Sequence, residues 1–167
     1  MEIIMQIGEG FVGEGSNAAH VNTVLGDRSG PMGAAWAGGL AGPSTGHAGF
    51  MVVGQPGISA VPPTLFVNKA AIAGPEHGNM TWGPAQAGVA KGVARALDDG
   101  VIDAESAQKL VLIAAVWVNP SADDAKAVFA NNAEATLQAL RNGRDALPTV
   151  TDFVAAGLSP WNPFFRP

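Results

Sequence analysis

Residues 110–118, with the sequence LVLIAAVWV, form the centre of the predicted fold. These nine apolar residues are the longest apolar run in the chain, and they are too few to cross a bilayer, which needs about 20. A run of this length, without Gly or Pro, is typical of a fully buried strand. After Asp123-Asp124, the residues Val128, Leu137 and Leu140 follow at helical spacing. They predict a helix that packs against this strand and ends at Gly143.

Upstream of residue 110 the chain alternates between strand and helix patterns. Strands are predicted at residues 3–12, 19–25, 50–53 and 64–72. Helices are predicted to begin at Pro31 and at Gly83-Pro84, because Pro is favoured in the first helical turn. The order β-β-α-β-β-α-β-α predicts an α/β (α+β) two-layer sandwich, with a mixed sheet and helices on one side. We expect residues 1–143 to form a single domain, and residues 144–167 to form a tail that packs on the surface or on a neighbouring subunit.

Composition excludes several classes of function. A net charge of −5 with nine Lys and Arg among 167 residues argues against a nucleic-acid surface, which needs a basic stripe. The absence of Cys excludes disulfides and thiolate chemistry. The first residues show no secretion signal, so a cytoplasmic protein without a membrane anchor is expected. Charged residues make up 14% of the chain against a usual share of about 25%, which suggests that other subunits cover part of the surface.

His20 is the first candidate for chemistry. Strand geometry places His20 and Asn22 on the same face of the predicted strand, roughly 6–7 Å apart. Imidazole is the side chain whose ordinary pKa suits proton transfer near neutral pH. The alternative is a half-exposed strand residue with no catalytic role.

Lys69 and Gln86 are the other unusual polar residues. The alternation of residues 64–72 puts Lys69 among apolar neighbours, where it either reaches a sheet edge or points into a cleft as a fixed positive charge. Gln86 lies on the inward stripe of the second helix. A buried amide needs partners, so Gln86 either caps a neighbouring strand or binds a polar ring.

Two other sequence patterns do not indicate a functional site. Residues 8–13 match the dinucleotide pattern GxGxxG, but the third Gly does not open a helix, so nucleotide binding is not expected. The three histidines, His20, His47 and His77, lack metal-ligand spacing, so no metal is expected.

Five short motifs together resemble the formaldehyde-activating enzymes. They are AHVN at 19–22 followed by Gly26 and Gly30-Pro31, PPTLFVNK at 62–69, WGPAQ at 82–86, DDAK with NAEAT at 123–126 and 132–136, and NPF at 162–164. The similarity spans residues 6–143, and the NPF motif at 162–164 extends it to the C-terminal tail. The resemblance rests on the order and intervals of these motifs.

The resemblance implies a cytoplasmic lyase that condenses formaldehyde with tetrahydromethanopterin, its co-substrate, to methylene-tetrahydromethanopterin and water. It also implies a fold similar to the second domain of ribosomal protein S5, and a homo-oligomer, a ring of five with sites between subunits. His20 falls on the position of the family's proton donor. The pterin-contacting positions fall on Asn22, Met51, Lys69, Ala71 and Gln86.

Two of these positions depart from the family pattern. The family typically has Asp where this chain has Asn22, and Thr where it has Ala71. An Asp beside the imidazole would raise the pKa of His20, whereas Asn supplies no charge. Two alternatives to the condensation reaction therefore stay open: a non-catalytic protein that binds a pterin or an aldehyde adduct, and an enzyme that acts on another aldehyde or another reduced pterin.

Overall fold

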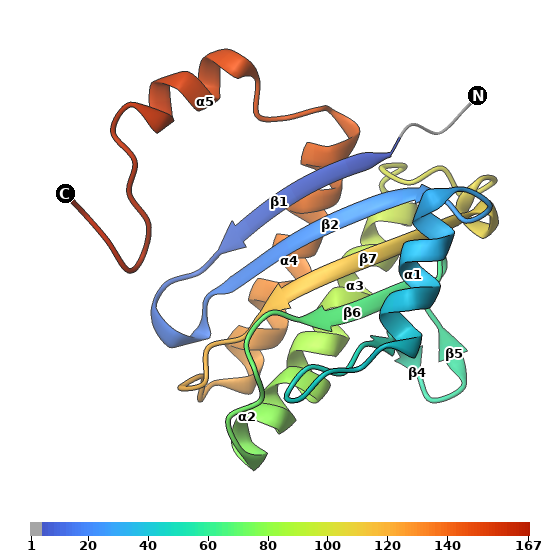
Figure 1. Cartoon of the computed structure of the whole chain (residues 1–167), viewed down its shortest axis with the longest axis horizontal. Coiled ribbons are helices and arrows are strands. Elements are labelled where there is room, and N and C mark those ends of the chain that lie inside the picture. Colours follow the sequence, from blue (N-terminus) through green and yellow to red (C-terminus); the bar gives the residue numbers. More distant parts are fainter. Residues whose placement is uncertain (1–4) are drawn as a thin grey trace.

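A computed structural model describes residues 5–167 of the chain, and its centre is a five-stranded sheet (Figure 1). The strands lie in the order β1-β2-β7-β6-β3. Their bounds are Gln6–Val12 for β1, Ala19–Asp27 for β2, Leu110–Trp117 for β7, Thr64–Asn68 for β6 and Phe50–Met51 for β3. β6 and β7 are parallel and the other neighbours are antiparallel. The mixed sheet and the central position of residues 110–118 are confirmed.

Two long helices cover one face of the sheet. α3 (Gln86–Asp98) and α4 (Ala125–Arg144) lie behind the strands and pack against each other (Figure 1). The core between them and the sheet includes Val21, Leu112, Val89 and Leu137, all of which are fully buried. Asp124 is the N-cap of α4, because its side chain accepts hydrogen bonds from the backbone N–H groups of the first turn. The predicted two-layer sandwich is therefore confirmed.

α1 (Pro31–Ala41) lies on the opposite, front face of the sheet, so the expectation that all helices lie on one side needs correction for this helix. It covers only one end, where Met32 packs on Gly26 and Gly39 approaches the side chain of Leu65. The other end of the front face carries the alternate residues of β1, β2 and β7, and these are exposed or half-buried. This open end of the front face is where the functional candidates gather.

Gly8 and Gly10 allow α4 to approach the sheet closely. A Cβ atom added at either position would overlap the backbone carbonyl oxygen of Ala139 or Ala135. Gly13 follows at the turn into β2 with φ 91°, in the left-handed region that Gly adopts readily. The glycines of the GxGxxG pattern therefore serve helix packing and a turn.

Several predicted boundaries need correction. The strand predicted at 64–72 ends at Asn68, whose side chain bonds the carbonyls of Gly46 and Ala70 and turns the chain. The strand predicted at 50–53 divides into β3 and β4 (Val53–Gln55), which pairs with β5 (Ile58–Ser59). Residues 75–82, for which no element was predicted, form α2 (Pro75–Met80) and the start of a wide helical turn at Thr81–Ala85, so the helix predicted to begin at Gly83-Pro84 continues from this turn into α3. Residues 3 and 4 of the first predicted strand lie outside the described residues.

The C-terminal segment contains a helix that the sequence pattern did not predict. α5 (Val150–Gly157) begins with a capping box formed by Thr149 and Asp152. Every residue from 144 to 167 is exposed, and α5 stands away from the sheet (Figure 1). The helix is thus held by its own cap and hydrogen bonds rather than by burial.

Candidate active site

Four polar side chains meet on the open end of the front face. His20 and Asn22 alternate along β2 and point to this face, while Ala19 and Val21 point to the core. Glu9 lies on β1 directly opposite Asn22. Lys69 follows the last residue of β6, and its backbone N–H donates to Val116 of β7. We refer to Glu9, His20, Asn22 and Lys69 as the His20 cluster.

Two contacts join the cluster into pairs. The Nε2 atom of His20 lies 3.0 Å from Oε1 of Glu9. The Lys69 ammonium group donates a hydrogen bond to Oδ1 of Asn22. The side chains of His20 and Glu9 are 35% and 57% exposed, so a ligand has access to both. The cluster therefore combines one carboxylate, one imidazole, one carboxamide and one ammonium group.

Electrostatics in the cluster favour the neutral imidazole. Burial, followed by the positive charge of Lys69, lowers the pKa of His20 below its ordinary value of 6.5, and the Glu9 carboxylate opposes this shift. Burial also lowers the pKa of Lys69, again against the opposing charge of Glu9. Glu9 is thus the group that favours the protonated forms of both bases.

A groove of about 1110 Å³ opens over His20 and Lys69. We call it the His20 groove. Its wall is partly aromatic: Phe11 and Trp117 come from the sheet, and Trp161 and Phe164 come from the C-terminal segment. The rings of Trp117 and Phe164 meet edge to face with centroids 6.4 Å apart. A flat heterocycle fits the chemistry of such a wall, because aromatic faces stack on it.

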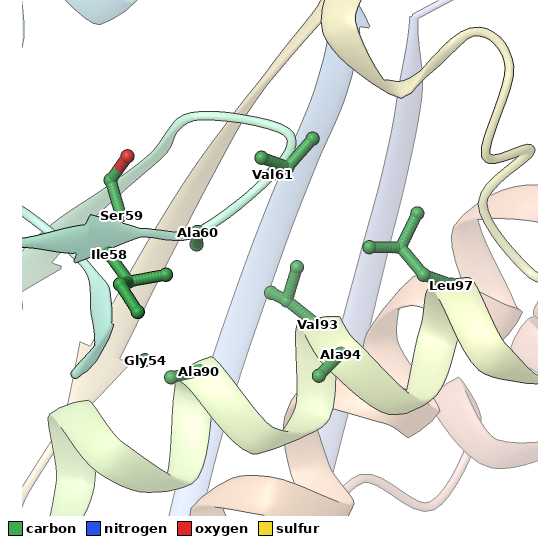
Figure 2. A pocket seen from close by; sticks show the side chains of 9 residues that line it. All are labelled: Gly54, Ile58, Ser59, Ala60, Val61, Ala90, Val93, Ala94 and Leu97. Atoms are coloured by element: carbon green, nitrogen blue, oxygen red, sulfur yellow. The ribbon is translucent and has the colours of Figure 1, made fainter.

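A second, smaller cavity lies elsewhere and carries no comparable chemistry. Figure 2 shows it between the β4–β5 hairpin and α3. Its volume is about 200 Å³. Its described lining is apolar except for Ser59, and it contains no ionisable side chain. Proton transfer and recognition of a polar ligand both need ionisable or polar groups, so the His20 groove is the candidate site.

The structure brings together His20, Asn22 and Lys69 but not the other three predicted residues. Gln86 begins α3 on the helical side of the sheet, where its Oε1 atom accepts a hydrogen bond of 2.6 Å from the backbone N–H of Val53. Of the two roles considered for this amide, the structure contains the cap on a neighbouring strand. Met51 lies on the short edge strand β3 and is 38% exposed.

Ala71 is exposed in the loop after β6, beside Gly46. Glu9 and the aromatic tail residues were missed by sequence reasoning. The alternation of Ile7, Glu9 and Phe11 on β1 is the sequence signal for Glu9, because it places the three side chains on one face of the strand.

Comparison with known proteins decides the family. The sequence model of the formaldehyde-activating enzyme family (Fae) matches residues 7–164. The chain belongs to the formaldehyde-activating enzyme family. The match includes Glu9, the rest of the His20 cluster and the tail as far as Phe164.

Relatives of this family differ in length. A 5,6,7,8-tetrahydromethanopterin hydro-lyase of Methanosarcina barkeri is 37% identical over 158 residues, which are 95% of this chain and 89% of that protein. A bifunctional enzyme Fae/Hps of Methanococcoides burtonii is 39% identical over 147 residues, or 88% of this chain. A similar enzyme of Methanothrix thermoacetophila is 38% identical over 144 residues, or 86% of this chain. The chain spans about 37% of the length of these two bifunctional enzymes.

Two kinds of feature are absent from residues 5–167. No group of three or more His, Cys, Asp and Glu side chains within that range is placed to hold a metal ion. None of the helices described there has both the length and the apolar character that a membrane crossing requires.

Proposed function

We propose that the chain condenses formaldehyde with tetrahydromethanopterin to give methylene-tetrahydromethanopterin and water. The observation that carries this proposal is the accessible His20 imidazole, which contacts a carboxylate in an aromatic-walled groove. Family membership supports the choice of reaction, since one relative is named a tetrahydromethanopterin hydro-lyase. In this proposal formaldehyde and the pterin are substrates, and no metal takes part.

The proposed reaction needs one proton donor. An amine of the pterin adds to formaldehyde and forms the first C–N bond, which gives a carbinolamine. Protonated His20 then donates a proton to the hydroxyl group as the C–O bond breaks, so that water leaves and an iminium ion remains. The second amine forms the second C–N bond and returns its proton to His20. A placed general acid contributes about 10²- to 10⁴-fold to the rate of such a step.

Lys69 and Asn22 are proposed to hold the polar atoms of the pterin. Their hydrogen bond places an ammonium group and an amide beside His20. Holding both amines of the pterin near the formaldehyde carbon makes ring closure effectively intramolecular.

Met51, Ala71 and Gln86 lie outside the His20 groove of one chain. The proposed pterin contacts of the exposed Met51 and Ala71 therefore require a neighbouring subunit, which agrees with the proposed ring of five. Gln86 is buried on the helical side and its Oε1 already accepts from Val53, so its proposed contact would in addition need this hydrogen bond to break. The exposed apolar side chains of Ile7, Phe11 and Phe153, which are 61%, 42% and 67% exposed, support contact between copies of the chain. We further propose that the tail, residues 144–167, packs on its own surface or on a neighbouring subunit, and that the protein is cytoplasmic.

Stopped-flow kinetics test the reaction directly. Formaldehyde and tetrahydromethanopterin are mixed with and without the purified chain, and methylene formation is followed by absorbance. We expect acceleration above the spontaneous rate and its loss in His20→Ala. An unaccelerated reaction with folded protein, or full activity in His20→Ala, would contradict the proposal.

Asn22 and Ala71 favour a second candidate function, a non-catalytic protein that binds a pterin or an aldehyde adduct. It would bind the pterin tightly without accelerating the reaction, and the double variant Asn22→Asp with Ala71→Thr would gain turnover. Parallel assays with bulkier aldehydes and with tetrahydrofolate separate both candidates from an enzyme that prefers another aldehyde or another reduced pterin.

A further inference from the structure

We propose that Glu9 is a positioning residue for His20, and that it performs from β1 the electrostatic role for which position 22 of β2, occupied by Asn22, has no carboxylate. The proposal rests on the proposed function, because it assigns His20 as the proton donor. The observation behind it is the 3.0 Å contact between Oε1 of Glu9 and Nε2 of His20. Asn22, directly opposite Glu9 in the β1–β2 register, is neutral and accepts from Lys69 instead.

The fold fixes the strand that carries Glu9. Gly8 and Gly10, on either side of it, leave no space between β1 and the backbone of α4. On the outer edge of β1, Asn142 of α4 donates a hydrogen bond of 2.8 Å to the Glu9 carbonyl, and the Phe11 N–H donates to Gln138 at 3.1 Å. The backbone of Glu9 is therefore held from both β2 and α4, while its side chain remains free to face His20.

The Glu9 carboxylate opposes the groups around His20 that disfavour the protonated form of its ring. Lys69, from the end of β6, disfavours the imidazolium ion, and so does the partial burial of the ring. β7 contributes Trp117, which has no charge, and the groove lining adds the charged residues Glu14 and Arg166. Glu9 is the carboxylate in contact with the ring. It is therefore the group that maintains a protonated fraction of His20, which a general acid must have.

The two strands also fix where the ring lies. Phe11, opposite His20 on β1, approaches the imidazole with ring centroids 6.0 Å apart. Glu9 contacts one ring nitrogen of His20, while Phe11 packs against the same imidazole from the position directly opposite on β1. Together they limit the rotamers of His20, so that loss of the carboxylate would affect both the charge and the orientation of the proton donor.

NMR titration of the full chain, labelled in its histidines, tests the coupling without relying on activity. We expect the titration midpoint of His20 to fall in Glu9→Gln and to change much less in Glu9→Asp. Glu105→Gln, which removes an exposed carboxylate in the loop between α3 and β7, is the control for the change in net charge. An unmoved His20 midpoint in folded Glu9→Gln would overturn the proposal.

Kinetics test the consequence for catalysis. In Glu9→Gln the high-pH limb of kcat should move to lower pH, and the rate at neutral pH should fall by less than the 10²- to 10⁴-fold loss of a general acid. Adding Asn22→Asp to Glu9→Gln should restore part of the rate, since it returns a carboxylate to the neighbouring strand. If the wild-type chain has no activity, but the titration midpoint of His20 still falls in Glu9→Gln, only the proposed reaction is contradicted. An active enzyme whose kcat profile is unchanged in Glu9→Gln would contradict the role of Glu9 alone.

Discussion

Glu9 and Asn22 lie directly opposite each other on β1 and β2, and their side chains share the open face of the sheet. The carboxylate of Glu9 contacts His20, whereas the amide of Asn22 accepts a hydrogen bond from Lys69. One strand therefore supplies the charge and the neighbouring strand supplies a neutral acceptor. An acid at position 22 would put a second carboxylate beside both bases.

Asn22→Asp is expected to raise the pKa of both His20 and Lys69, because a nearby negative charge favours their protonated forms. The high-pH limb of kcat should then move to higher pH. The measurement is the pH profile of stopped-flow condensation, with Asn79→Asp on the exposed surface of α2 as the control. A limb that moves to lower pH, or not at all, would contradict this assignment of charges.

Lys69→Met is expected to raise the titration midpoint of His20. The positive charge of Lys69 lowers the pKa of His20, and its removal leaves Glu9 as the nearest charge. Lys91→Met, on the exposed side of α3, should leave the midpoint unchanged. Histidine NMR gives both values, and a fall in the midpoint of Lys69→Met would show that Lys69 acts on the ring in another way.

The lowered pKa of His20 also predicts the direction of a stability change. The folded chain binds fewer protons at His20 than the unfolded chain, whose imidazole has its ordinary pKa of 6.5. The free energy of unfolding should therefore fall as pH drops from above 6.5 through the lower pKa of the folded state. Urea unfolding at several pH values should show a weaker decrease over this range in His20→Gln than in wild type.

Gly8→Ala is expected to destabilise the fold, because the added methyl group would overlap the Ala139 carbonyl of α4. Overpacking of this kind costs about 1–3 kcal/mol. Gly38→Ala on α1 is the matched control, since a Cβ there has nothing within 4 Å and should stabilise the helix by about 0.5–1 kcal/mol. Urea unfolding measures both, and equal stability of the two variants would contradict the close approach of β1 and α4.

Phe164→Ala is expected to weaken pterin binding about two- to tenfold without changing stability. Its ring lines the His20 groove and packs on Trp117, although its side chain is 78% exposed. An aromatic contact contributes about 0.5–1.5 kcal/mol beyond area burial. Calorimetric titration with tetrahydromethanopterin gives the affinity, and Phe165→Ala, which removes the neighbouring exposed ring outside the groove lining, is the control. Equal affinities of the two variants would show that the tail ring does not contact the pterin.

The sequence predicted the centre of the fold better than its edges. Residues 110–118 and the helix that follows carry strong patterns, because both are buried along most of their length. β3, β4 and β5 are two or three residues long, which is too short for a periodic signal. α5 is eight residues long, so the helical spacing of its apolar residues Val150, Phe153 and Val154 covers little more than one turn and is a weak signal.

The residues of the candidate site were likewise predicted only in part. His20, Asn22 and Lys69 were predicted to carry the chemistry, and the front face brings them together. The alternation along β1 gives the face on which Glu9 lies, but it does not show that β1 pairs with β2 and so places Glu9 beside His20. The alternation of residues 64–72 predicts the face of the sheet on which Lys69 lies, although β6 ends at Asn68, one residue before Lys69.

The hydrogen bonds from α4 to the outer edge of β1 have a consequence for assembly. An edge strand with free N–H and C=O groups is a template on which another chain can add a strand. Here the Phe11 N–H and the Glu9 carbonyl are already bonded to side chains of the same molecule. Copies of this protein should therefore associate through side chains on their faces, and a continuous sheet that runs from one copy to the next through this edge is disfavoured.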